Sequence, residues 1–303
     1  MELLRLLEGI RSPFLDILIS LITSLGEEAV GIVILGAVFW CISKRTAYGI
    51  GIAYFISGLA VQGLKICFRI DRPWIADPTL TPVVSAMEKA TGYSFPSGHT
   101  QSAVALYGSL GVRIKHKSVR AICFLIAVLV AFSRLYLGVH TPLDVVVALL
   151  ISFLLVFLTW RFLTFDTVDR KRDLIVSLAM ALCAVAMILI AMALYLNATI
   201  EHSYAADSLK AAGAGAGFAA GMYIERIYID FSVKTKNLFW QVLKFVIGII
   251  GVLAIKEGLK LLIGIGLTAD IFRYFLMLIW VTVLFPLIIK RFFAVRSDNR
   301  SVM

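Results

Sequence analysis

The sequence predicts an all-α integral membrane protein, and two features of its 303 residues support that prediction. Hydrophobic residues make up 60% of the chain and charged residues only 16%, with a mean hydropathy of +0.93. Soluble domains contain roughly 45–50% apolar and about 25% charged residues. The chain also contains many apolar runs of about 20 residues, the length that a helix needs to cross the hydrocarbon core. This composition excludes a soluble enzyme, a disordered chain and a nucleic-acid binder.

The apolar runs predict nine membrane crossings. They cover residues 28–43, 46–69, 97–114, 118–138, 141–164, 173–196, 206–228, 239–263 and 268–292. An earlier run, 14–25, follows Ser12-Pro13, a favourable helix start with proline at the first helical position. Its 12 residues are too few to span the bilayer comfortably, so we expect an interfacial or half-inserted helix, or a tenth crossing if it passes through.

Lysine and arginine collect in alternate connections, and this pattern predicts the orientation. The basic residues are Lys44 and Arg45; Arg113, Lys115, Lys117 and Arg120; Arg161, Arg170, Lys171 and Arg172; Arg226, Lys234 and Lys236; and Lys290, Arg291, Arg296 and Arg300. By the positive-inside rule these connections are cytoplasmic. Residues 70–96, 139–140 and 196–206 then lie on the outer side. We expect a multi-pass protein, most simply of a bacterial cytoplasmic membrane.

The connection 161–173 is the most polar interior stretch. It predicts a boundary between an N-terminal unit, 1–165, and a C-terminal unit, 166–303. In the C-terminal unit Gly213, Gly217 and Gly221 recur at four-residue spacing, which lets helices approach closely. We expect this face to pack within the chain rather than to form a dimer, and the oligomeric state is left open.

Three polar clusters on the predicted outer side do not fit a purely structural role. Ionisable residues near the membrane are costly and indicate function. The clusters run from Lys65 to Arg72-Pro73, from Pro96 through Ser97 and Gly98 to His99, and from Ser133-Arg134 through His140 to Asp144. Lys65, Arg72 and Arg134 place three positive charges together without matching carboxylates, which favours an anion. Ser97 and Gly98 open a helix whose free N–H groups also favour an anion.

His140 and Asp144 are suited to nucleophilic chemistry on a phosphate. Four residues apart, they lie on one helix face. A carboxylate can hold one ring nitrogen as N–H and leave the lone pair of the other free to attack phosphorus. His99, when protonated, could give its proton to the leaving alkoxide. The cations would stabilise the charge on the transferring group.

This arrangement resembles the type 2 phosphatidic acid phosphatase superfamily, whose pattern reads K-x6-R-P, P-S-G-H and S-R-x5-H-x3-D. The resemblance covers roughly residues 12–165. It implies that His140 is the nucleophile that becomes phosphohistidine, with Asp144 as its partner and His99 as the general acid. It also implies a set of phosphate ligands: Lys65, Arg72, Ser97, Gly98 and Arg134.

The resemblance further implies a six-helix phosphatase core from 14–25 through 141–164, with its active site at the outer membrane surface. About four additional C-terminal transmembrane helices lie outside the motifs and receive no role from it. We expect no metal and no other cofactor, because of the 19 acidic residues only Asp71 and Asp144 lie within the clusters, and a metal-dependent phosphatase would need clustered carboxylates or histidines.

The leading hypothesis is a membrane phosphatase that acts on a lipid phosphate monoester or diphosphate. The substrate could be phosphatidic acid, phosphatidylglycerol phosphate, a polyprenyl diphosphate or a sphingoid phosphate. The expected partners are this substrate and the bilayer, and no nucleic acid. One alternative is a phosphotransferase that passes the phosphate to another acceptor. The other is a non-catalytic lipid-binding or transport protein on the same scaffold.

Overall fold

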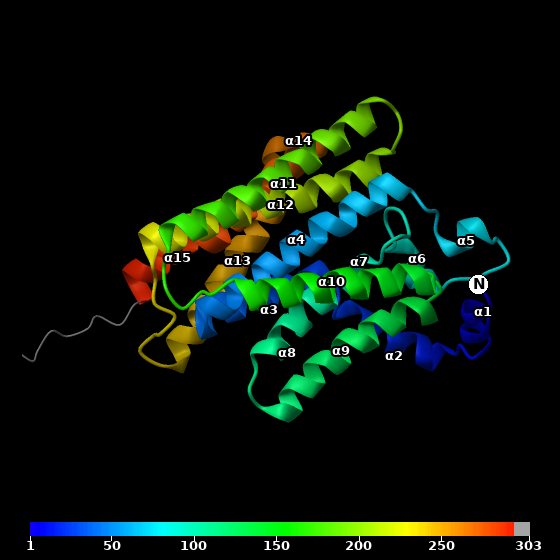
Figure 1. Ribbon diagram of the computed structural model, residues 1–303, viewed down its shortest axis with the longest axis horizontal. Coiled ribbons are helices and arrows are strands. Elements are labelled where there is room, and N and C mark those ends of the chain that lie inside the picture. Colours follow the sequence, from blue (N-terminus) through cyan, green and yellow to red (C-terminus); the bar gives the residue numbers. More distant parts are fainter. Residues whose placement is uncertain (294–303) are drawn as a thin grey trace, which may run out of the picture.

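A computed structural model describes residues 1–293, which form a bundle of long helices (Figure 1). The predicted all-α membrane architecture is confirmed, since the described residues contain no β-strand. Two of the basic residues predicted to be cytoplasmic, Arg296 and Arg300, lie outside the described residues.

The helices follow one another with short connections. In chain order they are α1 (Glu2–Gly9), α2 (Pro13–Ser24), α3 (Glu28–Ala37), α4 (Lys44–Phe68), α5 (Pro73–Ala76), α6 (Val84–Glu88), α7 (Gly98–Ala103), α8 (Ser109–Arg113), α9 (Lys117–Tyr136), α10 (Pro142–Phe162), α11 (Arg170–Leu196), α12 (His202–Ile224), α13 (Leu238–Ile263), α14 (Leu267–Ile279) and α15 (Phe285–Ile288). Wider π-helical turns extend or join them at Val38–Ile42, Val104–Gly108, Glu225–Ile229, Trp280–Leu284 and Ile289–Phe293.

Fewer helices meet the requirements for a crossing than the nine or ten predicted. Within residues 1–293, six are long and apolar enough: Lys44–Ala76, Lys117–Tyr136, Pro142–Phe162, Arg170–Leu196, Leu238–Ile263 and Leu267–Phe293. A seventh candidate is the pair Pro13–Ser24 and Glu28–Ile42, which is bent by 46°. By length and composition, the run predicted as an interfacial or half-inserted helix thus belongs either to a broken span or to a re-entrant loop.

With the bent pair counted as one span, the two predicted crossings without a counterpart are 97–114 and 206–228. The first is a short helix that a π-helical turn divides into α7 and α8. The second, α12, is rich in glycine and alanine and carries Asp207 and Lys210. Most of its residues are buried against α4, α11 and α14. A helix that neighbouring helices cover in this way does not need an apolar surface of its own.

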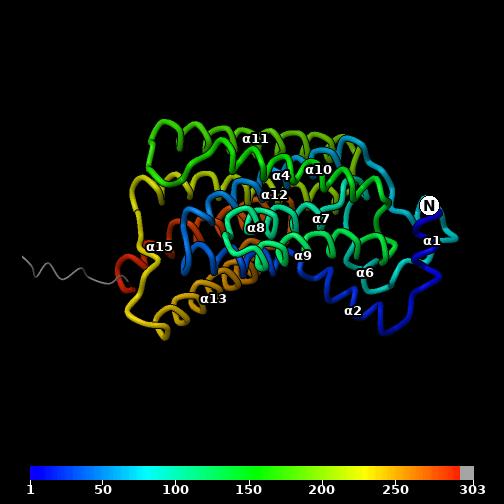
Figure 2. The backbone as a smooth tube through the Cα atoms, turned by 60° about the horizontal axis from the view of Figure 1, so that its bottom comes forward, coloured from blue at the N-terminus to red at the C-terminus, as the bar shows by residue number. Residues whose placement is uncertain are grey.

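Helix α4 lies between two groups of helices (Figures 1 and 2). It contacts α7 and α10 on one side and α11 and α12 on the other. The main apolar core draws on both predicted units, with Trp40 and Tyr48 from the first and Phe218 and Phe285 from the second. The division at residue 165 therefore stays a prediction, and the two parts share one packed interior.

The glycine face of α12 packs within the chain, as predicted. A Cβ atom at Gly213 would lie 2.4 Å from the backbone oxygen of Ile271, and one at Gly217 would lie 2.5 Å from that of Phe275. Only glycine permits this approach, which holds α12 against α14.

The short helices α1, α5 and α6 cover one end of the bundle, where the N-terminus also lies (Figure 1). The Arg5 guanidinium contacts the Asp77 carboxylate at 2.8 Å, and Arg11 Nε donates to the Tyr136 carbonyl at 2.9 Å. The basic connections after α10 and α12 lie at the opposite end of the bundle. These basic connections and the covered end therefore lie at opposite ends of the bundle.

Candidate active site

The predicted site residues come from the ends of five helices. Lys65 is in the last turn of α4, Arg72 precedes α5, Ser97 caps α7, Gly98 and His99 open it, Arg134 is in the last turn of α9, and His140 and Asp144 flank the start of α10. All of these helix ends face the end of the bundle that α5 and α6 cover (Figure 1). The three sequence clusters therefore meet in one place.

Direct hydrogen bonds join the clusters to one another. Arg72 Nη1 lies 3.0 Å from His140 Nε2, and the Ser97 N–H donates to the Asp144 carbonyl at 3.1 Å. The Lys65 ammonium donates to the carbonyls of Tyr93 and Ser94, the latter at 3.4 Å. Each cluster is thus fixed against another through a buried polar contact.

The contacts of His140 define which ring nitrogen is free to react. A guanidinium has only donors, so the contact with Arg72 requires Nε2 to accept. The proton of the neutral ring is then on Nδ1, which faces Asp144 Oδ2 at 3.4 Å. The Nε2 lone pair consequently points toward the cationic side of the site.

Asp144 is held by more than its histidine partner. Its Oδ2 atom accepts from the Ser94 hydroxyl at 2.6 Å and from the Thr141 N–H at 2.8 Å. The Thr141 hydroxyl in turn accepts from the Asp144 N–H, which completes a capping box at the start of α10. This carboxylate therefore has a fixed position from which to orient the imidazole.

Within residues 1–293, no carboxylate forms an ion pair with the positive charges of the site. Lys65, Arg72 and Arg134 are 7%, 5% and 2% exposed. Arg72 donates to the carbonyls of Gly92, Thr91 and Val139, and Arg134 to the Thr23 hydroxyl at 2.6 Å. The Nε atom of Arg134 is buried and has no hydrogen-bond partner among the described residues. Buried cations that contact only neutral groups require an anion to balance them.

The start of α7 offers further donors for such an anion. The Ser97 hydroxyl accepts from the Thr100 N–H at 3.4 Å and from its hydroxyl at 2.9 Å. The next two N–H groups, of Gly98 and His99, precede the first intrahelical hydrogen bond and are available to a ligand. A Cβ atom at Gly98 would meet no atom within 4 Å, so open space lies in front of this backbone.

Ser94 and Thr23, which hydrogen-bond to Asp144 and Arg134, were not among the predicted site residues. Neither has a spacing that points to these partners, because both contacts cross between distant segments. Thr141 could have been recognised, because threonine three residues before an acidic residue at a helix start is the capping-box pattern.

Two family models match the sequence. One, described as the PAP2 superfamily, matches residues 46–168, and the other, described as the PAP2 superfamily phosphatase transmembrane extension, matches residues 209–297. The first match contains every predicted site residue, and the second lies within the C-terminal unit.

Curated relatives carry names of lipid phosphatases. Human sphingosine-1-phosphate phosphatase 2 is 27% identical over 276 residues, covering 82% of this chain and 65% of the relative. Phosphatidylglycerophosphatase B of Bacillus subtilis is 32% identical over 156 residues, covering 46% of this chain and 75% of the relative. The chain spans 65%, 60% and 38% of the lengths of the human, mouse and Dictyostelium discoideum sphingosine-1-phosphate phosphatases that it matches.

Among solved structures, the crystal structure of Aquifex aeolicus LpxE is similar to this chain. The two are 28% identical with a TM-score of 0.47, covering 53% of this chain and 94% of that one.

Proposed function

The chain belongs to the PAP2 superfamily, and from that membership we propose that it hydrolyses a lipid phosphate monoester or diphosphate through a phosphohistidine at His140. The observation that supports this proposal most strongly is the arrangement around His140. Its Nδ1 atom faces a fixed carboxylate, and its Nε2 atom faces the cations. This is the geometry of an oriented nucleophile beside an anion site.

In the first step, His140 Nε2 attacks phosphorus as the bond from phosphorus to the leaving oxygen breaks. His99 gives its proton to that oxygen. Asp144 stabilises the positive charge that develops on the imidazole. Arg72 turns from Nε2 to the phosphate oxygens and, with Lys65 and Arg134, stabilises their charge.

In the second step, water attacks the phosphohistidine and the nitrogen–phosphorus bond breaks. His99 takes the proton from this water, and inorganic phosphate leaves. The two steps return both histidines to their starting protonation states, so the cycle closes without another reactant.

A lipid is the favoured substrate because the site lies where an apolar bundle meets its polar end. A headgroup can reach such a site while its tails stay in the bilayer. The relatives are named for sphingosine-1-phosphate, phosphatidylglycerophosphate and undecaprenyl diphosphate. The proposed substrate classes are phosphatidic acid, phosphatidylglycerol phosphate, a polyprenyl diphosphate and a sphingoid phosphate.

We propose that the site faces the extracytoplasmic side of a bacterial cytoplasmic membrane, because the basic connections lie at the other end of the bundle. Thr79, in the connection between α5 and α6, and Ser232, after α12, are both exposed. A membrane-impermeant maleimide should label Thr79→Cys in intact cells and Ser232→Cys only in broken cells. The reverse pattern would place the site in the cytosol.

The reaction is proposed to need no metal ion. Within residues 1–293 no three His, Cys, Asp or Glu side chains are arranged to hold one. We expect activity in excess EDTA to stay within about twofold of the untreated value, since the cations of the site are side chains. An activity that EDTA abolishes and a divalent ion restores would contradict this.

The pH profile should reflect an unusually weak base at His140. Burial, together with the positive charges of Arg72, Arg134 and Lys65, holds the pKa of His140 well below the usual value of 6.5. Because protonation removes the attacking lone pair, the loss of kcat/KM due to His140 should begin only well below pH 6.5. A free-enzyme pKa assigned to His140 at or above 6.5 by NMR titration would contradict this.

Phosphate release from purified protein, measured against a panel of lipid phosphates, tests the function itself. The proposal expects inorganic phosphate in stoichiometric amount with the dephosphorylated lipid. A phosphotransferase would release the dephosphorylated lipid without equivalent free phosphate. A lipid-binding or transport protein would release neither.

A further inference from the structure

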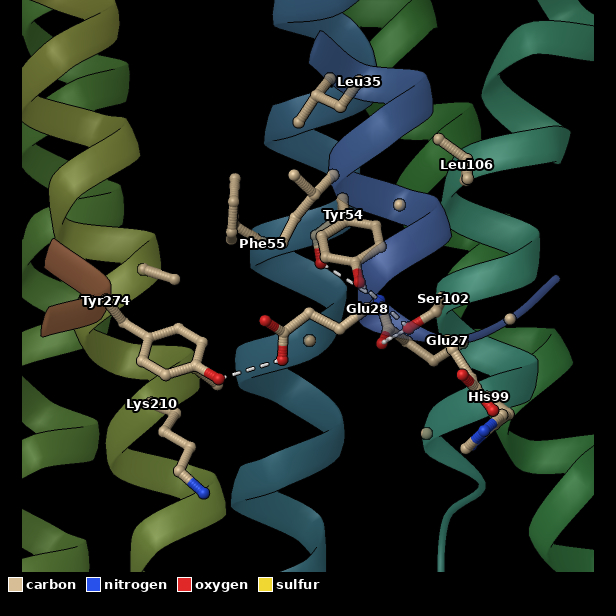
Figure 3. Close-up of a pocket in the computed structure, with 18 of the residues that line it drawn as sticks. Glu27, Glu28, Leu35, Tyr54, Phe55, His99, Ser102, Leu106, Lys210 and Tyr274 are labelled. Carbon is tan, nitrogen blue, oxygen red and sulfur yellow. Dashed lines mark hydrogen bonds between the residues drawn. The ribbon is translucent and has the colours of Figure 1, made fainter. Parts of the chain in front are cut away.

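A cavity of about 410 Å³ adjoins the candidate site (Figure 3). We call it the chamber. Gly98 and His99 form part of its wall, so it begins at the proposed phosphate site. Its volume lies within the roughly 300–1,000 Å³ of ordinary ligand pockets.

The lining of the chamber changes from polar to apolar along its length. Lys89, Thr91, Asp207 and Lys210 line it near the covered end of the bundle, where His99 lies. In Figure 3 His99 and Lys210 lie toward one end of the view, and Leu35 and Leu106 lie toward the other. Along α4 the lining runs from Gln62 to Ile50, which corresponds to about 18 Å at the helical rise.

The C-terminal helices supply much of the apolar wall. Ala214 from α12, Val252 from α13, and Met277, Leu278 and Val281 from α14 and the following π-helical turn line the chamber. They face α3, α4 and the turn after α7 across the space. The chamber thus lies between the part that matches the PAP2 superfamily and the part that matches its transmembrane extension.

The polar groups midway along the chamber satisfy one another. Glu28 accepts from the Tyr274 hydroxyl at 3.1 Å (Figure 3). It also accepts from the Lys256 ammonium at 3.1 Å. The Ser102 hydroxyl donates to Tyr54 at 3.3 Å. Polar groups that are already paired do not require a polar ligand, so an uncharged hydrocarbon can lie beside them.

We infer that the chamber holds one hydrophobic chain of the lipid phosphate, so that the C-terminal helices form part of the substrate-binding site. The inference rests on the proposed function, because the phosphate must lie at His140 for the chain to enter beside His99. Transfer of methylene groups from water or micelle surface into an apolar cavity is favourable. Charged and polar groups at the entrance suit the headgroup end of the same molecule.

Gly58 offers a way to fill the chamber without touching the catalytic residues. It lines the chamber from α4, and a Cβ atom there would approach nothing closer than the Gln101 amide at 3.8 Å. Gly258 in α13 is a matched control, because it is also helical, has no atom within 4 Å of a Cβ, and does not line the chamber.

The experiment compares Gly58→Leu and Gly258→Leu on a series of single-chain alkyl phosphates from butyl to octadecyl. For the wild type, kcat/KM should rise with each added methylene and level off once the chain fills the chamber. Gly58→Leu should level off at a shorter chain and lower kcat/KM for octadecyl phosphate at least about tenfold. Its kcat/KM for butyl phosphate, which also reports correct folding, should stay within about twofold of the wild type. Gly258→Leu should follow the wild-type profile throughout.

The outcomes separate this inference from the proposed function. If the wild type releases phosphate from no alkyl phosphate or lipid phosphate, the proposed function fails. If the wild type is active but its kcat/KM does not depend on chain length, or both variants share one profile, the chamber does not hold the chain. In that case the proposed function would still stand. If Gly58→Leu fails to fold, the presence or absence of the plateau in the wild type decides the question.

Discussion

Replacing His140 by alanine is expected to lower kcat for phosphate release by at least about 10⁴-fold, as for the loss of other covalent nucleophiles. The reason is that Nε2 is the only atom proposed to bond to phosphorus. The cations would still bind the substrate, so KM should change far less than kcat. The measurement is steady-state phosphate release from a lipid phosphate by the purified variant.

His116→Ala is the matched control for this variant, since His116 is an exposed histidine in the connection before α9. It should retain wild-type activity. Alanine at position 140 also removes a buried ring, so thermal unfolding should be compared for both variants. A folded His140→Ala protein that keeps more than about 1% of wild-type kcat would rule out the proposed nucleophile.

Asp144→Asn is expected to lower kcat by about 10² to 10⁴-fold, the range seen when a histidine loses its orienting carboxylate. The same oxygen, Oδ2, accepts from the Ser94 hydroxyl and the Thr141 N–H, and it faces His140 Nδ1. An asparagine can place its amide oxygen at that position and keep all three contacts. The variant therefore removes the negative charge that stabilises the imidazolium, with little change in shape.

The control for this substitution is Asp166→Asn, because Asp166 is 68% exposed and pairs with Arg45 near the opposite end of the bundle. This variant should have wild-type kcat. The kcat of Ser94→Ala should lie between those of Asp144→Asn and Asp166→Asn, since this substitution removes one hydrogen bond from Asp144 but leaves its charge. Equal activity for Asp144→Asn and Asp166→Asn would contradict the role proposed for Asp144.

Much of the fold could be predicted, because the bilayer requires long apolar helices and places charged residues in the connections between them. The predicted crossings 118–138 and 141–164 correspond to α9, Lys117–Tyr136, and α10, Pro142–Phe162. The number of crossings could not be predicted, because α12 is shielded by its neighbours and α2 joins α3 through a bend. Both features depend on packing between helices that are distant in sequence.

The sequence could predict that the site residues meet in one place, because their spacing and the membrane side of each loop both pointed to it. The contacts of Arg72 with His140 Nε2 and of Ser94 with Asp144 could not be predicted. Each joins two segments that are distant in the sequence, and no residue spacing relates them. The chamber could not be predicted either. Its lining from Leu35, Phe55 and Val281 consists of aliphatic and aromatic residues that look the same as any membrane core.

The most direct test of the account is to find where the phosphoryl group is bound during turnover. The protein is mixed with a lipid phosphate labelled at phosphorus, quenched in alkali, in which a phosphoramidate survives, and digested for peptide mapping. The account predicts label on His140, in an amount that matches the initial burst of dephosphorylated lipid. Label on any other side chain, or an unlabelled His140 during such a burst, would contradict it.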